Sequence, residues 1–139
     1  MKNLNRKTAY LMALFVCLFS TAFAQLPDSK GTDFWVAFPP NYSSGARLEL
    51  FISSDVSSTV TISSAHTGYS KTITTTAGAV STVSLANSFE VSNYQTVQGK
   101  GIHIVSSSEI SVYGLNAITY SSDAYMGLPT DILGDEYLI

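Results

Sequence analysis

The sequence predicts an all-β protein: an antiparallel β-sandwich or barrel-like meander, preceded by an N-terminal signal peptide and truncated at its C-terminus. Short segments alternate between apolar and polar side chains, which is the period of a half-buried strand. Turn-forming residues separate these segments at similar intervals, as in an antiparallel meander. Beyond residue 24, no window of about eleven residues has the period of a helix.

Residues 1–24 have the pattern of an export signal. A positive start with Lys2, Arg6 and Lys7 precedes an apolar core at residues 9–19 and a small-x-small cleavage site that ends at Ala24. The apolar core is too short to cross about 30 Å of hydrocarbon as a helix, which argues against a retained anchor. Cys17 lacks the small preceding residues that lipid attachment requires. We therefore expect a secreted or cell-surface protein that begins at Gln25, with no membrane insertion after signal removal.

The first predicted strand, residues 33–38, follows a polar leader at residues 25–31. Pro39 and Pro40 end this strand because proline cannot donate to a sheet ladder. The second strand, residues 47–54, has the clearest alternation. Leu48, Leu50 and Ile52 share one face, and Glu49 and Ser53 share the other.

Three further strands are predicted at residues 59–63, 69–75 and 80–85, with turns at residues 54–55, 66–68 and 77–78. Threonine favours the pleated segments and serine favours the turns, so composition agrees with periodicity. Residues 87–100 are predicted to form a loop. In this loop we expect Phe89, Val91 and Tyr94 to pack inward.

Residues 102–106 and 110–118 are predicted to be two strands of a hairpin. The second strand has Ile110 and Val112 on one face and Tyr113, Leu115 and Ala117 on the other. This pattern predicts a central strand covered on both sides, with Val112 and Leu115 both buried.

The C-terminal part is predicted to hold one helical turn and the start of another strand. Within residues 123–134, Thr130 or Asp131 is suited to cap the turn and Gly134 to end it. Residues 136–139 then begin a strand whose neighbours are missing. We therefore expect residues 32–139 to be the N-terminal part of an incomplete domain with an exposed, aggregation-prone edge.

The charge balance excludes two classes of partner. Without the signal, four basic residues face ten acidic ones, a net charge of −6, and the basic residues are not clustered. Such a surface argues against nucleic acid and anionic membranes. Cys17, the one cysteine, lies in the signal, so the mature chain is predicted to fold without disulfides.

Candidates for chemistry are few. Carboxylates near the C-terminus form the best metal candidate, a calcium site made of Asp123, Asp131, Asp135 and Glu136. Their spacing does not match an EF-hand, and capping or turn formation explains Asp131 and Asp123 equally well. No other cofactor is predicted. The many serines lack a Gly-x-Ser-x-Gly elbow, so no catalytic residue is assigned.

The histidines and aromatic residues favour structural roles. His66 is predicted in an exposed turn, and His103 in a strand as a partly buried sheet residue. Phe34, Trp35 and Phe38 favour core packing, with a ligand platform as the alternative. Residues 99–101 (GKG) are predicted to form a turn before a strand, and residues 41–43 (NYS) match a glycosylation sequon.

Two segments resemble a known family. Residues 30–42 (KGTDFWVAFPPNY) and 101–139, with SVYGLN at 111–116 and DAYMGLPTDILGDEY at 123–137, are similar to the N-terminal domain of the IgGFc-binding protein family, especially its bacterial cell-surface members. The resemblance implies an extracellular, β-rich, non-catalytic domain at the front of a longer modular chain. The resemblance supplies no contact residues for this sequence. Fold does not imply function, so the family name by itself assigns no ligand.

These observations predict a secreted or cell-surface adhesion module that binds a protein or glycan ligand and is not an enzyme. The alternative is the N-terminal, non-catalytic part of a secreted hydrolase or carbohydrate-active enzyme. We expect further domains of the same chain to follow.

Overall fold

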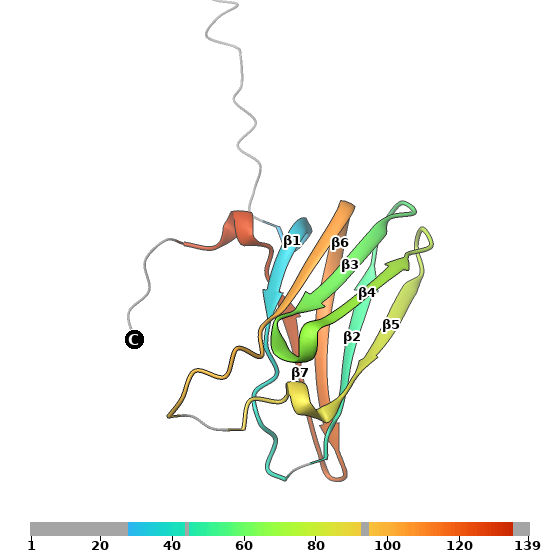
Figure 1. Ribbon diagram of the computed structural model, residues 1–139. Helices are drawn as coiled ribbons and strands as arrows, with labels where there is room; N and C mark the ends of the chain where they lie inside the picture. The colour runs from blue at the N-terminus through green and yellow to red at the C-terminus, as the bar shows by residue number, and fades with distance from the viewer. Residues whose placement is uncertain (1–27, 44, 93–94, 135–139) are drawn as a thin grey trace, which may run out of the picture.

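The computed structural model describes residues 28–43, 45–92 and 95–134, and it is all-β (Figure 1). The strands are β1 (Gly31–Val36), β2 (Arg47–Ser53), β3 (Thr59–Ser64), β4 (Tyr69–Thr74), β5 (Val80–Leu85), β6 (Ile102–Ile118) and β7 (Ser121–Gly127). Helical structure in the described residues is limited to the 3-10 turns η1 (His66–Gly68), η2 (Asn87–Phe89) and η3 (Thr130–Ile132). None of the described segments is an apolar helix long enough to cross a membrane.

Several predictions fall on residues outside these ranges. They concern the signal peptide, Tyr94, the carboxylates Asp135 and Glu136, and the strand at residues 136–139.

The long strand β6 organises the antiparallel sheet, which curls into a half-barrel (Figure 1). Its first half pairs with β1 and β3, and β4 extends from β3. Its second half pairs with β2 and β7, and β5 extends from β2. We call β4-β3-β6-β1 the first half-sheet and β5-β2-β6-β7 the second half-sheet. Every pairing between these strands is antiparallel, so the predicted fold class is confirmed.

The core lies on the concave side of this curled sheet. Along β6 the even-numbered residues from Ile102 to Asn116 point inward, and most of them are buried. Leu48, Leu50 and Ile52 of β2 are fully buried, as their alternation predicts. They join a single cluster that also includes Phe34, Phe38, Val60, Ile62, Val83, Phe89, Ile104, Ile110 and Val112.

The predicted hairpin at residues 102–118 is wrong, because the two halves of β6 do not pair with each other. In β1, Gly31 pairs with Ile110 of β6, but Asp33, two residues later, pairs with Val105. This shift in register marks the irregularity at which β6 bends. The sequence there, residues 106–109 (SSSE), has no glycine or proline to close a hairpin turn. Instead, hydroxyls bond this bend to neighbouring strands: Ser54 Oγ donates to the Glu109 carbonyl at 2.8 Å, and Thr59 N donates to Ser107 Oγ at 3.0 Å.

Strand β7 was not predicted. Ser121, Ser122 and Asp123 are weak strand formers, yet they pair with residues 116–118 of β6. A ring contact explains part of this pairing: a Cβ added to Gly114 would lie 2.5 Å from Tyr125 Cζ, so the glycine leaves room for that ring. The Tyr125 hydroxyl donates to the Ala37 carbonyl at 2.7 Å and ties β7 to the end of β1.

The predicted helical turn is present as η3, but its predicted caps are wrong. Pro129 precedes the turn, no side chain caps it, and Leu133 follows it. Proline fits the first positions of a helical turn because it needs no hydrogen-bond acceptor there.

No described segment covers the outer face of the second half-sheet, contrary to the expectation that β6 is covered on both sides. Val112 is fully buried, but Tyr113 is 45% exposed and Leu115 is only partly buried. Tyr113 lies between Phe51 of β2 and Met126 of β7 in the register. The apolar residues on the outer face of β6 therefore belong to an exposed row of side chains that crosses neighbouring strands. The aromatic and aliphatic side chains of this row shield one another from water.

A buried polar network lies at the end of the core formed by the second half of β6. Asn116, 1% exposed, donates from Nδ2 to the Pro39 carbonyl at 2.7 Å. The Glu90 carboxylate accepts from Asn41 N at 2.8 Å and from Asn116 Nδ2 at 3.4 Å. Asn41 Nδ2 donates to Asn116 Oδ1 at 3.3 Å. These bonds fix the loop after Pro40 against β6.

Candidate ligand-binding face

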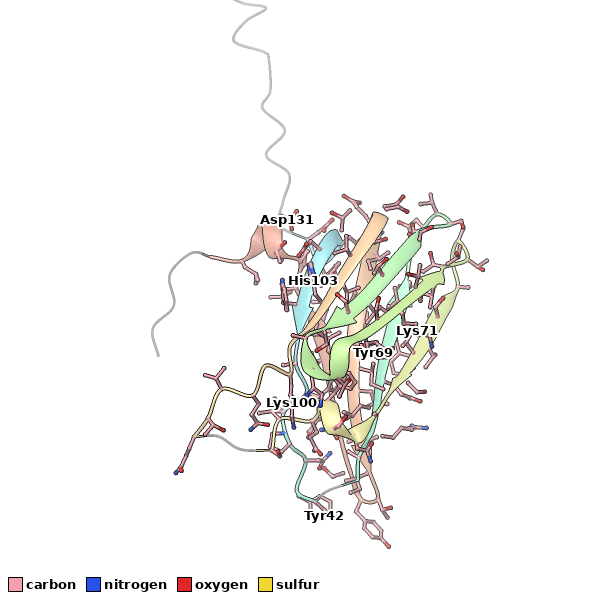
Figure 2. The ribbon with its side chains drawn as sticks, in the orientation of Figure 1. Tyr42, Tyr69, Lys71, Lys100, His103 and Asp131 are labelled. Carbon is pink, nitrogen blue, oxygen red and sulfur yellow. The ribbon has the colours of Figure 1, made fainter. Side chains whose placement is uncertain are left out.

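The outer face of the first half-sheet carries an exposed tryptophan held by its neighbours. Trp35 in β1 pairs in register with His103 in β6. Their rings stack with centroids 4.5 Å apart and planes 9° from parallel, while the Trp35 side chain remains 57% exposed. The imidazole therefore covers part of the indole and leaves the rest open to solvent. His103 is labelled in Figure 2.

Asp33 orients the imidazole. Its Oδ2 lies 2.9 Å from His103 Nε2, and the two side chains are 40% and 29% exposed. Trp35, His103 and Asp33 thus form one contiguous group, which we call the Trp35 cluster. A carboxylate has capacity for several hydrogen bonds, so Asp33 can accept another bond from a ligand while it holds His103.

Hydroxyl groups continue the face away from the Trp35 cluster. In register, His103 lies opposite Ser63 of β3, which lies opposite Ser70 of β4. A second row runs from Asp33 through Val105 to Thr61 and then Thr72. In the sequence these positions alternate with buried residues such as Ile62 and Ile104, so they point outward. The result is an open strand surface with one large aromatic group beside serine and threonine hydroxyls.

The start of β6 is shaped to receive the indole. A Cβ on Gly101 would lie 3.4 Å from Trp35 Cε3, so the ring rests close to this glycine. Ser64 Oγ donates to the Gly101 carbonyl at 2.7 Å and fixes the backbone there. Residues 99–101 lie directly before β6 and Gly99 has a φ of 57°, but they do not form the regular turn that the sequence predicts. Lys100 Nζ donates to the Glu90 carbonyl at 2.7 Å, which is a structural contact.

Two of the four predicted calcium ligands are described, and they do not meet. Asp123 lies in β7 opposite Asn116, whereas Asp131 lies in η3, close to Gly31 of β1. Both are exposed. Within the described part of the chain, no three His, Cys, Asp or Glu side chains come close enough to hold a metal ion. Asp135 and Glu136 lie outside that part.

His66 is not the exposed turn residue predicted from the sequence. It is partly buried, and its ring meets Phe89 edge-on at 5.3 Å. Tyr69 meets the same phenyl ring at 5.3 Å, and burial raises the pKa of its hydroxyl. The His66 ring therefore contributes to packing over η2.

The predicted aromatic core is correct for two of its three members. Phe34 and Phe38 are fully buried, and Phe38 meets Tyr125 edge-on at 5.9 Å. Trp35 points the other way because β-strand side chains alternate. The sequence contained evidence for this orientation. In a strand, Asp33 and Trp35 lie on the face opposite to Phe34, and the charge of Asp33 marks that face as the polar one.

The sequon at Asn41 is held within the fold. Asn41 Nδ2, the atom that glycosylation would modify, donates to both oxygens of Asn116 at 3.3 Å. In the folded chain this amide is therefore engaged.

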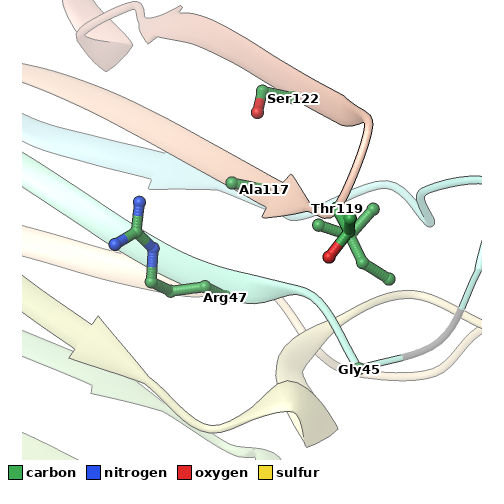
Figure 3. A pocket seen from close by; sticks show the side chains of 6 residues that line it. Gly45, Arg47, Ala117, Thr119 and Ser122 are labelled. Atoms are coloured by element: carbon green, nitrogen blue, oxygen red, sulfur yellow. The ribbon is translucent and has the colours of Figure 1, made fainter.

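A shallow hollow of about 430 Å³ lies where β6 turns into β7 (Figure 3). Its lining residues are Gly45, Arg47, Ala117, Ile118, Thr119 and Ser122. The small Ala117 and Ser122 create the space beside the Arg47 side chain. Arg47 Nε already lies 3.6 Å from Glu49 Oε2, so its charge has a partner. The Trp35 cluster is the stronger candidate because it combines an open aromatic surface with oriented polar groups.

In comparisons with known proteins, no family model, no curated protein and no solved structure matches this chain.

Proposed function

We propose that this protein is a secreted or cell-surface, non-catalytic module that binds an extracellular protein or glycan through the outer face of its first half-sheet. The observation that carries the proposal is Trp35, an indole 57% exposed and stacked on His103. Tryptophan is enriched among residues that dominate binding energy, because it buries a large area at low entropic cost.

The neighbours of Trp35 reduce the cost of binding further. His103 limits the motion of the indole, and Asp33 in turn limits the motion of His103. A side chain that is ordered before binding loses less entropy when a ligand arrives. The export signal and the family resemblance described above agree with a ligand outside the cell.

Binding arrays test this proposal. The exported chain would be applied to arrays of extracellular proteins, with IgG Fc among them, and of glycans. Two variants would be compared: Trp35→Ala removes the proposed contact, and Tyr113→Ala removes an aromatic group of similar exposure from the other half-sheet. We expect a bound ligand whose signal falls with Trp35→Ala and persists with Tyr113→Ala.

Two results would contradict the proposal: no ligand on either array, or a ligand that the Tyr113 variant loses and the Trp35 variant retains. Repeating the assay with EDTA tests the separate calcium hypothesis for Asp123, Asp131, Asp135 and Glu136. A chelator-sensitive signal would support a metal role in binding.

A further inference from the structure

We infer that the ligand of the Trp35 cluster is a neutral oligosaccharide, one pyranose ring of which stacks on the open part of the Trp35 indole. This inference rests on the proposed binding function and names the ligand class for the same site.

The first argument is the shape of the aromatic surface. His103 lies nearly parallel to the indole, at 9°, and the Trp35 side chain is still 57% exposed. One face of the ring is therefore supported by the imidazole, while more than half of the tryptophan surface remains open to solvent. A pyranose ring presents a face of C–H groups of similar size, so stacking removes apolar area of both partners from water.

The second argument is the polar surround. A protein hot spot is normally ringed by contacts that exclude water, whereas Trp35 is flanked by the polar side chains of Asp33 and His103, and a hydroxyl row begins at Ser63 on the far side of His103. Carboxylate, imidazole and hydroxyl groups can each donate to or accept from sugar hydroxyls. A site that bonds ligand hydroxyls also discriminates strongly against ligands that lack them.

The third argument is charge. Asp33 contributes a carboxylate to the cluster, and the mature chain has four basic residues against ten acidic ones. Such a surface repels acidic sugars at short range. The Trp35 cluster is therefore matched to neutral sugars, including N-acetylated ones.

The fourth argument is length. The row from Trp35 through His103 and Ser63 to Ser70 crosses four neighbouring strands. Three inter-strand spacings of about 4.8 Å amount to roughly 14 Å of open surface. This is enough length for a short oligosaccharide to lie across the strands next to the Trp35 cluster.

The chain provides its own reporter for the test, because Trp35 is the one tryptophan in all 139 residues. We would titrate the exported chain separately with cellohexaose, mannohexaose, xylohexaose and chitohexaose while recording tryptophan emission and its quenching by iodide. At least one oligosaccharide should give a saturable change in emission and protect Trp35 from iodide.

Variants measured by calorimetry complete the test. Trp35→Ala should weaken binding at least about tenfold, and Trp35→Phe should weaken it less because an aromatic surface remains. His103→Ala should also weaken binding, since the indole loses its support. Tyr113→Ala is the matched control and should leave the affinity unchanged. Circular dichroism of each variant checks that the fold is intact.

The outcomes separate this inference from the proposed function. If no oligosaccharide binds, but the arrays yield a protein ligand lost in Trp35→Ala, the ligand class is wrong and the binding function stands. If an oligosaccharide binds equally well to Trp35→Ala, the site is wrong. If neither array nor titration yields a ligand, both proposals fall.

Discussion

Asn116 connects three segments through one buried side chain, and its removal should be costly. Asn116→Ala would leave the Pro39 carbonyl without its present partner, and Asn41 Nδ2 would keep only the backbone carbonyl of residue 116. We expect the free energy of unfolding to fall by about 2–3 kcal/mol, because buried polar groups that lose a partner keep their desolvation cost. Urea denaturation measures this change.

The exposed Asn87 provides the control for Asn116. Asn87→Ala should change the stability by less than about 0.5 kcal/mol. Equal effects of the two substitutions would show that the network around Asn116 contributes little.

Tyr125 should make the protein sensitive to alkali. Burial raises the pKa of its hydroxyl from the ordinary value of 10.0 to about 12. The unfolded chain then loses this proton at a lower pH than the folded chain, so stability is fully present below pH 10 and falls between pH 10 and 12. After a reduction for solvent screening, we expect a loss of about 1–2 kcal/mol over this window.

Absorbance titration at alkaline pH and urea melts of Tyr125→Phe test this prediction. The variant should lose the latest-ionising tyrosine and keep the smaller shift of Tyr69, and its stability should depend less on pH above pH 10. A normal titration of every tyrosine in the wild-type chain would contradict the assignment.

Strand β6 offers a direct comparison of its two faces. Val112 is fully buried in the core, whereas Leu115 lies partly exposed on the outer face of the second half-sheet. Val112→Ala should lower the free energy of unfolding by about 2–3 kcal/mol, since it removes two methyl groups and leaves a cavity. Leu115→Ala should cost less than about 1 kcal/mol.

Chemical denaturation of these two β6 variants checks the predicted asymmetry. Equal costs for both substitutions would mean that the outer face of β6 is covered in solution.

The whole molecule should unfold in one step. Both half-sheets contain β6, and their buried residues form a single cluster. Trp35 fluorescence reports on the first half-sheet, while far-ultraviolet circular dichroism reports on all strands. We expect the two signals to give coincident urea transitions, as in a two-state unfolding. Separate midpoints would show that the half-sheets unfold independently.

Export should produce a chain that begins at Gln25. Small residues at positions 22 and 24 fit a signal peptidase site. N-terminal sequencing of the exported protein measures the cleavage position. A chain that retains Met1 at the membrane would contradict the signal assignment.

Local patterns of the sequence determined much of the fold. The alternation in residues 47–54 predicted both the strand β2 and its buried residues, because a strand with one face in the core must repeat every two residues. The same period predicted β3, β4 and β5 nearly to their ends. Turn chemistry predicted the connection at Gly78, whose φ of 70° suits glycine.

Tertiary pairing decided the rest. Whether residues 102–118 form a hairpin or one bent strand depends on which distant segments offer hydrogen bonds, and β1, β2, β3 and β7 supply them. Strand β7 forms from weak strand residues because β6 presents an edge and Gly114 admits the Tyr125 ring. The alternation around Phe34 could have placed Trp35 on the outside. Its meeting with His103, 68 positions along the chain, follows from the register of β1 with β6, which no local pattern encodes.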